Sequence, residues 1–180
     1  MIAISKHAIS LSLILATALT LASGAWAQTG GYIGFAAGQA DDKVLNETDR
    51  GLKVFGGWRF APNLAAELAY VDLGSYGPAG ATIDQYGVSA QFVGLVPLGQ
   101  SGVSLFGKAG VFSWSVERYN NNNYYYSSNN PDDSGTDLAV GAGLQIDFQG
   151  RMGLRAEWER FYDVAGGDVD LISAGFFYRF

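Results

Sequence analysis

Two glutamates that stand two residues apart form the arrangement in this sequence that most resembles a catalytic one. Glu157 and Glu159 lie in the segment RMGLRAEWERFY, and Arg155 shares their alternating face. A pair of carboxylates can divide the roles of general acid and general base between them. The same pair beside an arginine is also typical of structural ion pairing. We expect ion pairing here rather than catalysis.

The remaining composition excludes the common catalytic chemistries. The chain has no cysteine, and its only histidine is His7, close to the N-terminus. Histidine is the commonest general base and metal ligand, and cysteine is the other usual zinc ligand. Asp132 and Asp133 offer oxygen ligands of the kind that calcium prefers, but their spacing is not that of an EF-hand loop. We therefore predict no metal, no cofactor and no enzymatic activity.

Residues 1–27 have the features of a cleaved secretory signal. Lys6 precedes the apolar stretch AISLSLILATALTLA, and Ala25-Trp26-Ala27 forms a small-residue cleavage motif. A membrane anchor helix is the alternative, but the stretch is shorter than the roughly 20 residues that such a helix needs. We expect cleavage after Ala27, which leaves residues 28–180 as one domain.

The mature chain would carry a clear negative charge. It keeps all 17 acidic residues and ten of the eleven basic ones, so its net charge is −7. Binding to nucleic acid needs a basic surface that contacts phosphates. We therefore predict no nucleic-acid partner.

Hydrophobic residues alternate with period two through most of the mature chain, which predicts strands. The alternation is unbroken from Leu138 to Phe148, whereas the run 111–114 leaves the face assignment of its segment open. Longer connections, at 39–50, 73–81, 117–136 and 163–168, alternate with short ones, as in an up-and-down meander. The eight predicted strands are 31–39, 51–60, 63–72, 82–96, 102–116, 136–148, 151–162 and 170–180.

An eight-stranded meander can close as a soluble barrel with an apolar lumen or as a membrane barrel with an apolar exterior. Its interior is just wide enough for side chains to fill. One face of these strands carries glycine, serine, glutamine and charges of both signs, and five cations against four carboxylates nearly cancel. We therefore predict an all-β, eight-stranded antiparallel transmembrane barrel with that face inside. The predicted lumen ion pairs involve Lys53, Arg59, Glu67, Lys108, Asp147, Arg155, Glu157, Glu159 and Arg179.

The length of the chain agrees with this number of strands. Tilted strands of about 9 to 11 residues cross a bilayer, so eight strands use roughly 72 to 88 residues. The rest of the mature chain suffices for the turns and loops. Twelve strands would leave too few residues for loops of the lengths seen here.

Several segments resemble the eight-stranded transmembrane domain of the OmpA-like outer-membrane barrels. They are GYIGFAAG, LAAELAYVDLG, LFGKAGVFSW, LRAEWERFYD and DLISAGFFYRF. The resemblance implies charged lumen residues at Glu67, Lys108, Arg155 and Glu157. It also implies that Phe176, Tyr178 and Phe180 form the C-terminal signal for the barrel-assembly machinery.

The resemblance further implies a bacterial location. We expect a monomer in outer-membrane lipid, with periplasmic N- and C-termini and extracellular longer loops. The chain stops at Phe180, so we expect no cell-wall-binding domain of the kind that follows the barrel in OmpA.

The loop ERYNNNNYYYSSNNPDDSGT leaves the function open between alternatives. Tyrosine, serine and asparagine are typical of recognition surfaces, and the tyrosines concerned are Tyr119, Tyr124, Tyr125 and Tyr126. Our first hypothesis is a structural role in envelope integrity with an occluded lumen. The alternatives are an adhesin that binds a host or surface ligand through residues 117–136, and a narrow porin-like path.

Overall fold

The computed structural model of the chain describes residues 29–43, 47–76, 81–99, 101–120, 133–148 and 151–180. Within these ranges the regular structure consists of strands, and no helix there could span a bilayer. The predicted signal at 1–27 lies outside them. The eight strands are β1 (Gly30–Asp42), β2 (Glu47–Ala61), β3 (Leu64–Tyr76), β4 (Ala81–Pro97), β5 (Val103–Asn120), β6 (Asp133–Phe148), β7 (Met152–Val164) and β8 (Gly167–Arg179).

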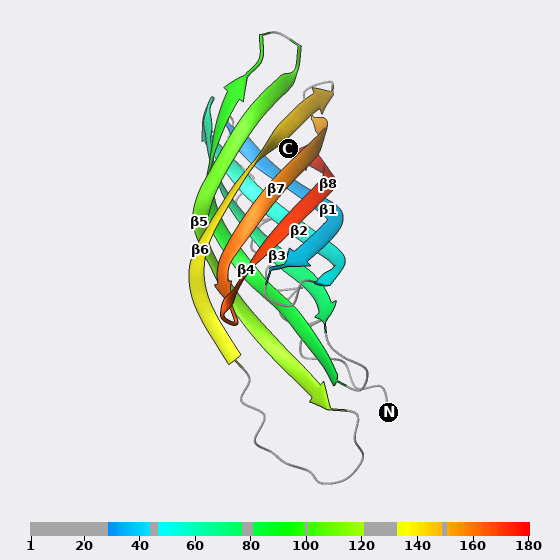
Figure 1. Cartoon of the computed structure of the whole chain (residues 1–180). Helices are drawn as coiled ribbons and strands as arrows, with labels where there is room; N and C mark the ends of the chain where they lie inside the picture. Colours follow the sequence, from blue (N-terminus) through cyan, green and yellow to red (C-terminus); the bar gives the residue numbers. More distant parts are fainter. Residues whose placement is uncertain (1–28, 44–46, 77–80, 100, 121–132, 149–150) are drawn as a thin grey trace, which may run out of the picture.

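The strands form a closed antiparallel barrel in which each strand pairs with the next one in the chain (Figure 1). Pairing of β1 with β8 closes it, from Tyr32 opposite Arg179 to Asp42 opposite Val169. The predicted fold class is confirmed. We call the end with Gly30 and Phe180 the terminal end, and the end with the connections after β1, β3, β5 and β7 the loop end.

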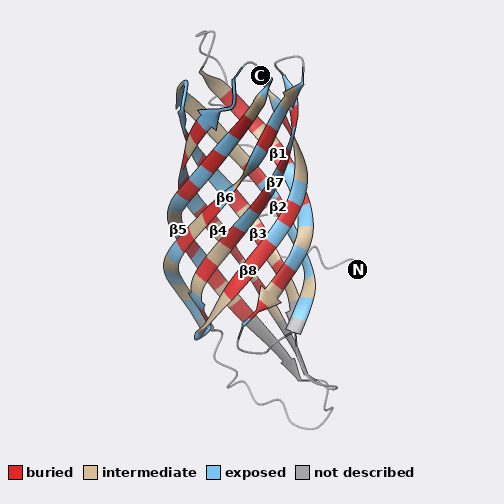
Figure 2. Ribbon diagram, turned by 45° about the horizontal axis from the view of Figure 1, so that its top comes forward, coloured by how far each residue is buried: buried red, intermediate tan, exposed pale blue. Residues whose placement is uncertain are grey.

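Buried and exposed residues alternate along the strands, as the burial colours show (Figure 2). The outward positions hold large apolar side chains that are exposed on the isolated chain, including Phe92 at 70%, Ile172 at 66% and Phe35 at 61%. Exposed apolar side chains all around a closed barrel have no protein to pack on, so they are suited to hydrocarbon. Closure leaves no unpaired strand edge in the lipid.

The open question of which way β5 faces is answered by its pairing with β4. The register runs without a shift from Ala81 opposite Asn120 to Pro97 opposite Ser104. Phe112 and Trp114 are therefore on the same inner face as Lys108, and all three are buried. Phe112 and Trp114, which interrupt the alternation of polar and apolar residues in this segment, therefore face the lumen.

The strands are longer than the sequence analysis assumed. They have 13 to 18 residues, and they continue into segments that were predicted as loops. The connections at the loop end shrink to 43–46, 77–80, 121–132 and 165–166. Cross-strand hydrogen bonding extends the barrel wall through polar sequence such as ETDR and DSGT, where hydrophobic alternation gives no signal.

Large rings inside the barrel lie over glycines that stand directly opposite them on the neighbouring strand. A Cβ at any of these glycines would collide with the ring, for example 2.7 Å from Trp114 at Gly135. The pairs are Tyr32 with Gly57, Phe55 with Gly34, Phe106 with Gly143, Trp114 with Gly135 and Phe177 with Gly153. Five glycines and five aromatic residues of the lumen thus have one packing cause.

Candidate functional site

A cluster of ion pairs crosses the middle of the lumen. The Lys108 Nζ lies 2.6 Å from Glu159 Oε1, 2.8 Å from Glu157 Oε2 and 3.4 Å from Glu67 Oε1. Lys53 Nζ pairs with Glu157 and lies 2.5 Å from Glu159 Oε2. None of these side chains is more than 1% exposed. Four strands, β2, β3, β5 and β7, are linked through their inner faces.

Arg155 extends this cluster toward the terminal end. Its Nη1 donates to Glu67 Oε2 at 2.6 Å and its Nη2 to Gln145 Oε1 at 3.1 Å. Its guanidinium also lies 4.8 Å from the ring centroids of Phe55 and Phe106, which is a favourable distance for cation–π contact. Tyr32 donates its hydroxyl to Glu67 Oε2 at 2.9 Å. A buried charge is tolerated only with such partners.

Charge is balanced in this central cluster, which contains three cations and three carboxylates. Glu157 and Glu159 each contact both lysines, so neither carboxylate is free to accept a proton from a substrate. The arrangement supports the structural interpretation of the glutamate pair over the catalytic one.

An apolar layer fills the lumen between the charged cluster and the loop end. On β3, β5 and β7 its members follow the charged residue in the chain, as Val71 follows Glu67 and Phe161 follows Glu159, and the rings of Phe112 and Phe161 are 4.4 Å apart. Every member is at most 2% exposed. The layer consists of Ala40, Val71, Leu73, Phe112, Val116, Phe161, Val164, Val169 and Leu171.

This layer was not predicted, because we expected a polar lumen throughout. A signal for it exists in the sequence, since many inward positions near the loop end are apolar, although Asp42 and Gln85 are buried there as a polar pair. Val169 and Leu171, for example, share the face of Ser173 and Arg179.

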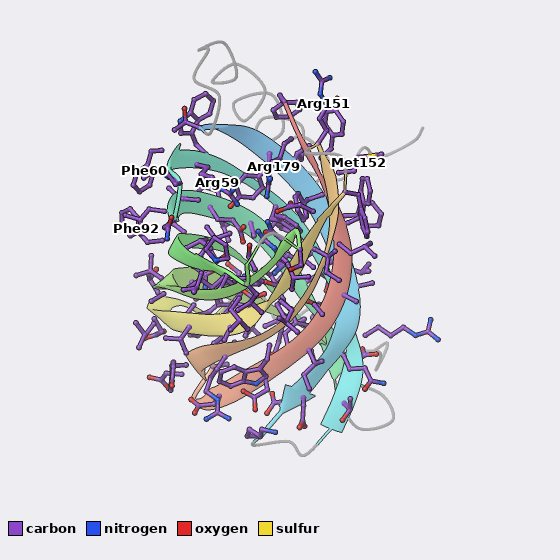
Figure 3. The ribbon with its side chains drawn as sticks, turned by 90° about the horizontal axis from the view of Figure 1, so that it is seen from above. Arg59, Phe60, Phe92, Arg151, Met152 and Arg179 are labelled. Carbon is purple, nitrogen blue, oxygen red and sulfur yellow. The ribbon has the colours of Figure 1, made fainter. Side chains whose placement is uncertain are left out.

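Two more arginines lie at the terminal end of the lumen, where Figure 3 shows Arg59 and Arg179 inside the barrel and Phe60 and Phe92 outside it. Arg179 Nη2 lies 2.6 Å from Asp147 Oδ1. Arg59 was predicted to join the ion pairs, but it forms none with any residue in the described ranges. The prediction that Arg59 forms an ion pair is therefore corrected. Asp147, the carboxylate at this end of the lumen, pairs with Arg179 instead.

These arginines border a narrow hollow near the terminal end. Its walls approach so closely that no free water molecule fits between them. The lining residues are Tyr32, Arg59, Ala65, Leu95, Gln145, Arg155, Phe177 and Arg179.

A second charged group lies on the outer surface near the loop end. Arg160 donates to both oxygens of Asp170, at 2.7 and 2.8 Å, in the bidentate geometry favoured by guanidinium and carboxylate. Lys43 lies 3.4 Å from the same carboxylate and hydrogen-bonds to Asp41, a bond that raises the pKa of Lys43 above its ordinary value. Sequence reasoning did not find this group, because its members are on three separate segments.

The other predicted site residues are distributed over both ends. Phe176, Tyr178 and Phe180 share the outer face near the terminal end, where the rings of Tyr178 and Phe180 are 5.9 Å apart. Tyr119 belongs to β5, opposite Thr82. Tyr124, Tyr125 and Tyr126, together with Asp132, lie outside the described residues.

Comparison with protein families identifies the class of this barrel. Residues 8–180 match the family described as outer membrane protein beta-barrel domain. The chain belongs to this outer-membrane barrel family. Membership implies a location in the bacterial outer membrane and confirms the resemblance to eight-stranded outer-membrane barrels. A comparison with curated protein sequences found no match.

Solved structures of the same architecture support the fold of this outer-membrane barrel. Neisserial surface protein A is 16% identical with a TM-score of 0.63, over 88% of this chain and 100% of that one. The N-terminal barrel of Pseudomonas aeruginosa OprF is 14% identical, TM-score 0.58, over 83% and 97%. Ail, the attachment invasion locus protein of Yersinia pestis, in complex with the heparin analogue sucrose octasulfate, is 20% identical, TM-score 0.54, over 84% and 97%. At these identities the likeness concerns the fold alone.

Proposed function

We propose that this protein is a structural component of the bacterial outer membrane that contributes to envelope integrity without conducting solutes. The observation that carries the proposal is the filled lumen. A balanced ionic cluster occupies its middle, and an apolar layer closes it toward the loop end. An ion that entered would have to leave water and displace buried ion pairs, both of which are costly.

The proposal includes an orientation and a maturation step. The signal 1–27 is removed, and residues 28–180 form a monomeric barrel whose termini are periplasmic and whose longer connections are extracellular. The assembly machinery recognises Phe176, Tyr178 and Phe180. The lengths of the strands support this orientation. At the loop end the strands extend beyond the apolar band with polar sequence, notably β4, β5 and β6 with 16 to 18 residues.

Deletion of the gene tests the structural role. We expect the deletion strain to become more sensitive to bile salts and large antibiotics, and the wild-type gene to restore resistance. Outer-membrane fractionation and a heat-dependent shift on an SDS gel would show that the restored protein is folded. A deletion strain with unchanged sensitivity would contradict the proposal.

A second candidate function is surface recognition through residues 117–136. It is favoured by β5, the longest strand, which carries the chain to Asn120 before the segment rich in tyrosine, serine and asparagine. The similarly folded Ail is named for attachment and was crystallised with a heparin analogue. Replacing residues 119–134 by a short Gly–Ser turn should abolish attachment to host cells or heparin beads if this function holds. Unchanged attachment by the folded variant would refute it.

A further inference from the structure

The terminal end of the lumen contains more positive charge than its carboxylates can neutralise. The central cluster is balanced, and Arg179 is paired with Asp147 at 2.6 Å. Arg59, in contrast, has no carboxylate partner among the described residues, although its Nε is shielded from solvent. At this end of the lumen, the cation in excess among the described residues is therefore Arg59.

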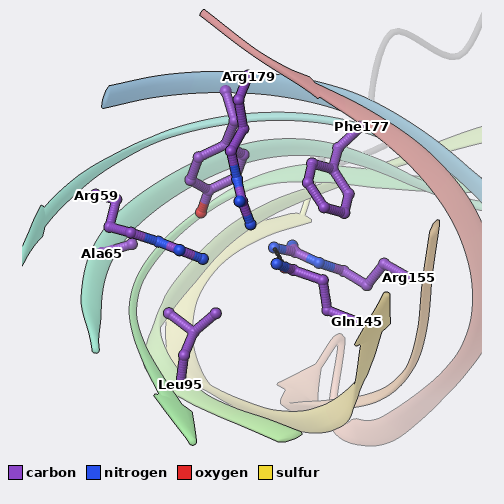
Figure 4. Close-up of a pocket in the computed structure, with 8 residues that line it drawn as sticks. Arg59, Ala65, Leu95, Gln145, Arg155, Phe177 and Arg179 are labelled. Carbon is purple, nitrogen blue, oxygen red and sulfur yellow. Dashed lines mark hydrogen bonds between the residues drawn. The ribbon is translucent and has the colours of Figure 1, made fainter. Parts of the chain in front are cut away.

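Three guanidinium groups converge in this place. Arg59, Arg155 and Arg179 come from β2, β7 and β8 and point toward one another across the hollow (Figure 4). Each has a buried nitrogen without a hydrogen-bond partner in the described chain, namely Arg59 Nε, Arg155 Nε and Arg179 Nη2. The contact of Arg179 with Asp147 is an ion pair whose angles do not fit a hydrogen bond. Like charges in such proximity repel unless an anion lies between them.

We propose that this arginine hollow, lined by Arg59, Arg155 and Arg179, binds a small phosphate-class oxyanion. Guanidinium presents planar pairs of N–H donors that match the oxygens of phosphate, and bonds between ionised groups are the strong ones. An apolar ligand would contact Leu95 and Phe177 but would leave Arg59 unpaired. An oxyanion supplies the acceptors and the negative charge that this end of the lumen lacks.

The rim arginines must move to admit the anion, because the hollow has no free space for it. Arg179 is 22% exposed and Arg59 is half-buried, so both can swing outward. Arg155 is held at its inner end by Glu67, Gln145 and two aromatic rings. It forms the fixed floor of the site, and the rim arginines close over the ligand.

Arginine Nε–H signals in ¹⁵N–¹H spectra can test the site directly. The folded barrel in octyl glucoside micelles, which contain no phosphate, is titrated with sodium phosphate at constant ionic strength. We expect saturable shifts of the Arg59 Nε–H signal. Arg59→Gln should weaken binding by about tenfold or more, because one charge-assisted contact is lost.

The matched control is Arg151→Gln, which removes an exposed arginine at the same end but outside the lumen (Figure 3). It should leave the affinity for phosphate unchanged. A heat-dependent gel shift confirms that each variant is folded, and Arg59→Lys, which keeps the charge but loses the planar fork, should bind with intermediate affinity.

Three outcomes discriminate. Shifts that do not saturate, or an equal loss of affinity in the Arg59 and Arg151 variants, would overturn the proposal. Saturable binding that depends on Arg59 supports a free oxyanion. If the Arg59 signal instead shifts on transfer to phosphatidylglycerol nanodiscs without added phosphate, the phosphate group comes from a lipid headgroup. None of these outcomes depends on the role in envelope integrity.

Discussion

Replacing Lys108 by methionine should destabilise the barrel strongly, because it removes one of three buried cations from a balanced cluster. The side chain is buried and contacts three carboxylates within 3.4 Å. In Lys108→Met, Lys53 and Arg155 remain to neutralise three glutamates. Removing one partner of a buried ion pair costs about 3–5 kcal/mol, and we expect a loss of that size in the free energy of unfolding.

A compensating substitution separates the loss of charge balance from the loss of packing. Glu159 is the carboxylate closest to Lys108, and its other partner, Lys53, keeps Glu157. The double variant Lys108→Met with Glu159→Gln therefore restores equal numbers of charges. It should recover about 2 kcal/mol of the loss, within the range of coupling energies between contacting residues.

Urea unfolding in phospholipid vesicles, followed by tryptophan fluorescence, measures both quantities. Lys43→Met is the control, since Lys43 is an exposed lysine of the loop end whose removal should leave the unfolding midpoint unchanged. A loss below about 1 kcal/mol for Lys108→Met would refute the reasoning. So would a double variant no more stable than the single one.

Three further predictions concern packing, permeation and assembly. Gly57→Ala should lose about 1–3 kcal/mol of stability in the same unfolding assay because its Cβ would collide with Tyr32 and the Ala66 carbonyl. Gly94→Ala, whose Cβ would have its nearest neighbour at 4.0 Å, should be neutral, and an equal loss in both would contradict the collision argument. The wild-type protein should give a closed baseline in a planar bilayer, and discrete steady openings would show that the lumen is not sealed. Phe180→Ser should lower the amount of folded barrel in the outer membrane of cells while the purified variant still refolds in detergent, as a gel shift would report. Normal levels in cells would count against the assembly signal.

Much of the fold was predictable because a lipid-facing barrel imposes a strict period of two. The pattern on β7 and β8 identifies Arg155, Glu157 and Glu159 as inward and Phe176 and Tyr178 as outward. The ends of the strands were not predictable. Beyond the bilayer both faces of the wall can be polar, so residues 47–50 and 133–135 were predicted as loops although they pair as strands.

The partners within the lumen could not be predicted from alternation alone. Alternation identifies which charged residues face inward. It does not give their positions along the barrel axis, which depend on strand register and tilt. Arg59 and Arg179 therefore look equivalent in the sequence, yet only Arg179 reaches Asp147. The bidentate pair of Arg160 and Asp170 joins residues directly opposite on β7 and β8, which becomes visible only when the register is known.

The rings that lie over glycines also protect the barrel against an error of assembly that hydrophobic alternation permits. A slip of one residue between strands reverses every side chain and is strongly disfavoured. A slip of two residues keeps each side chain on its face, so the difference in polarity between lipid and lumen does not oppose it. On β1 and β2, however, Tyr32 faces Gly57 and Gly34 faces Phe55. A two-residue slip in one direction would bring Tyr32 opposite Phe55 and crowd two rings into one position, and a slip in the other direction would place Gly34 opposite Gly57 and leave a gap. Complementary large and small residues thus select one pairing of the strands from those that polarity alone would allow.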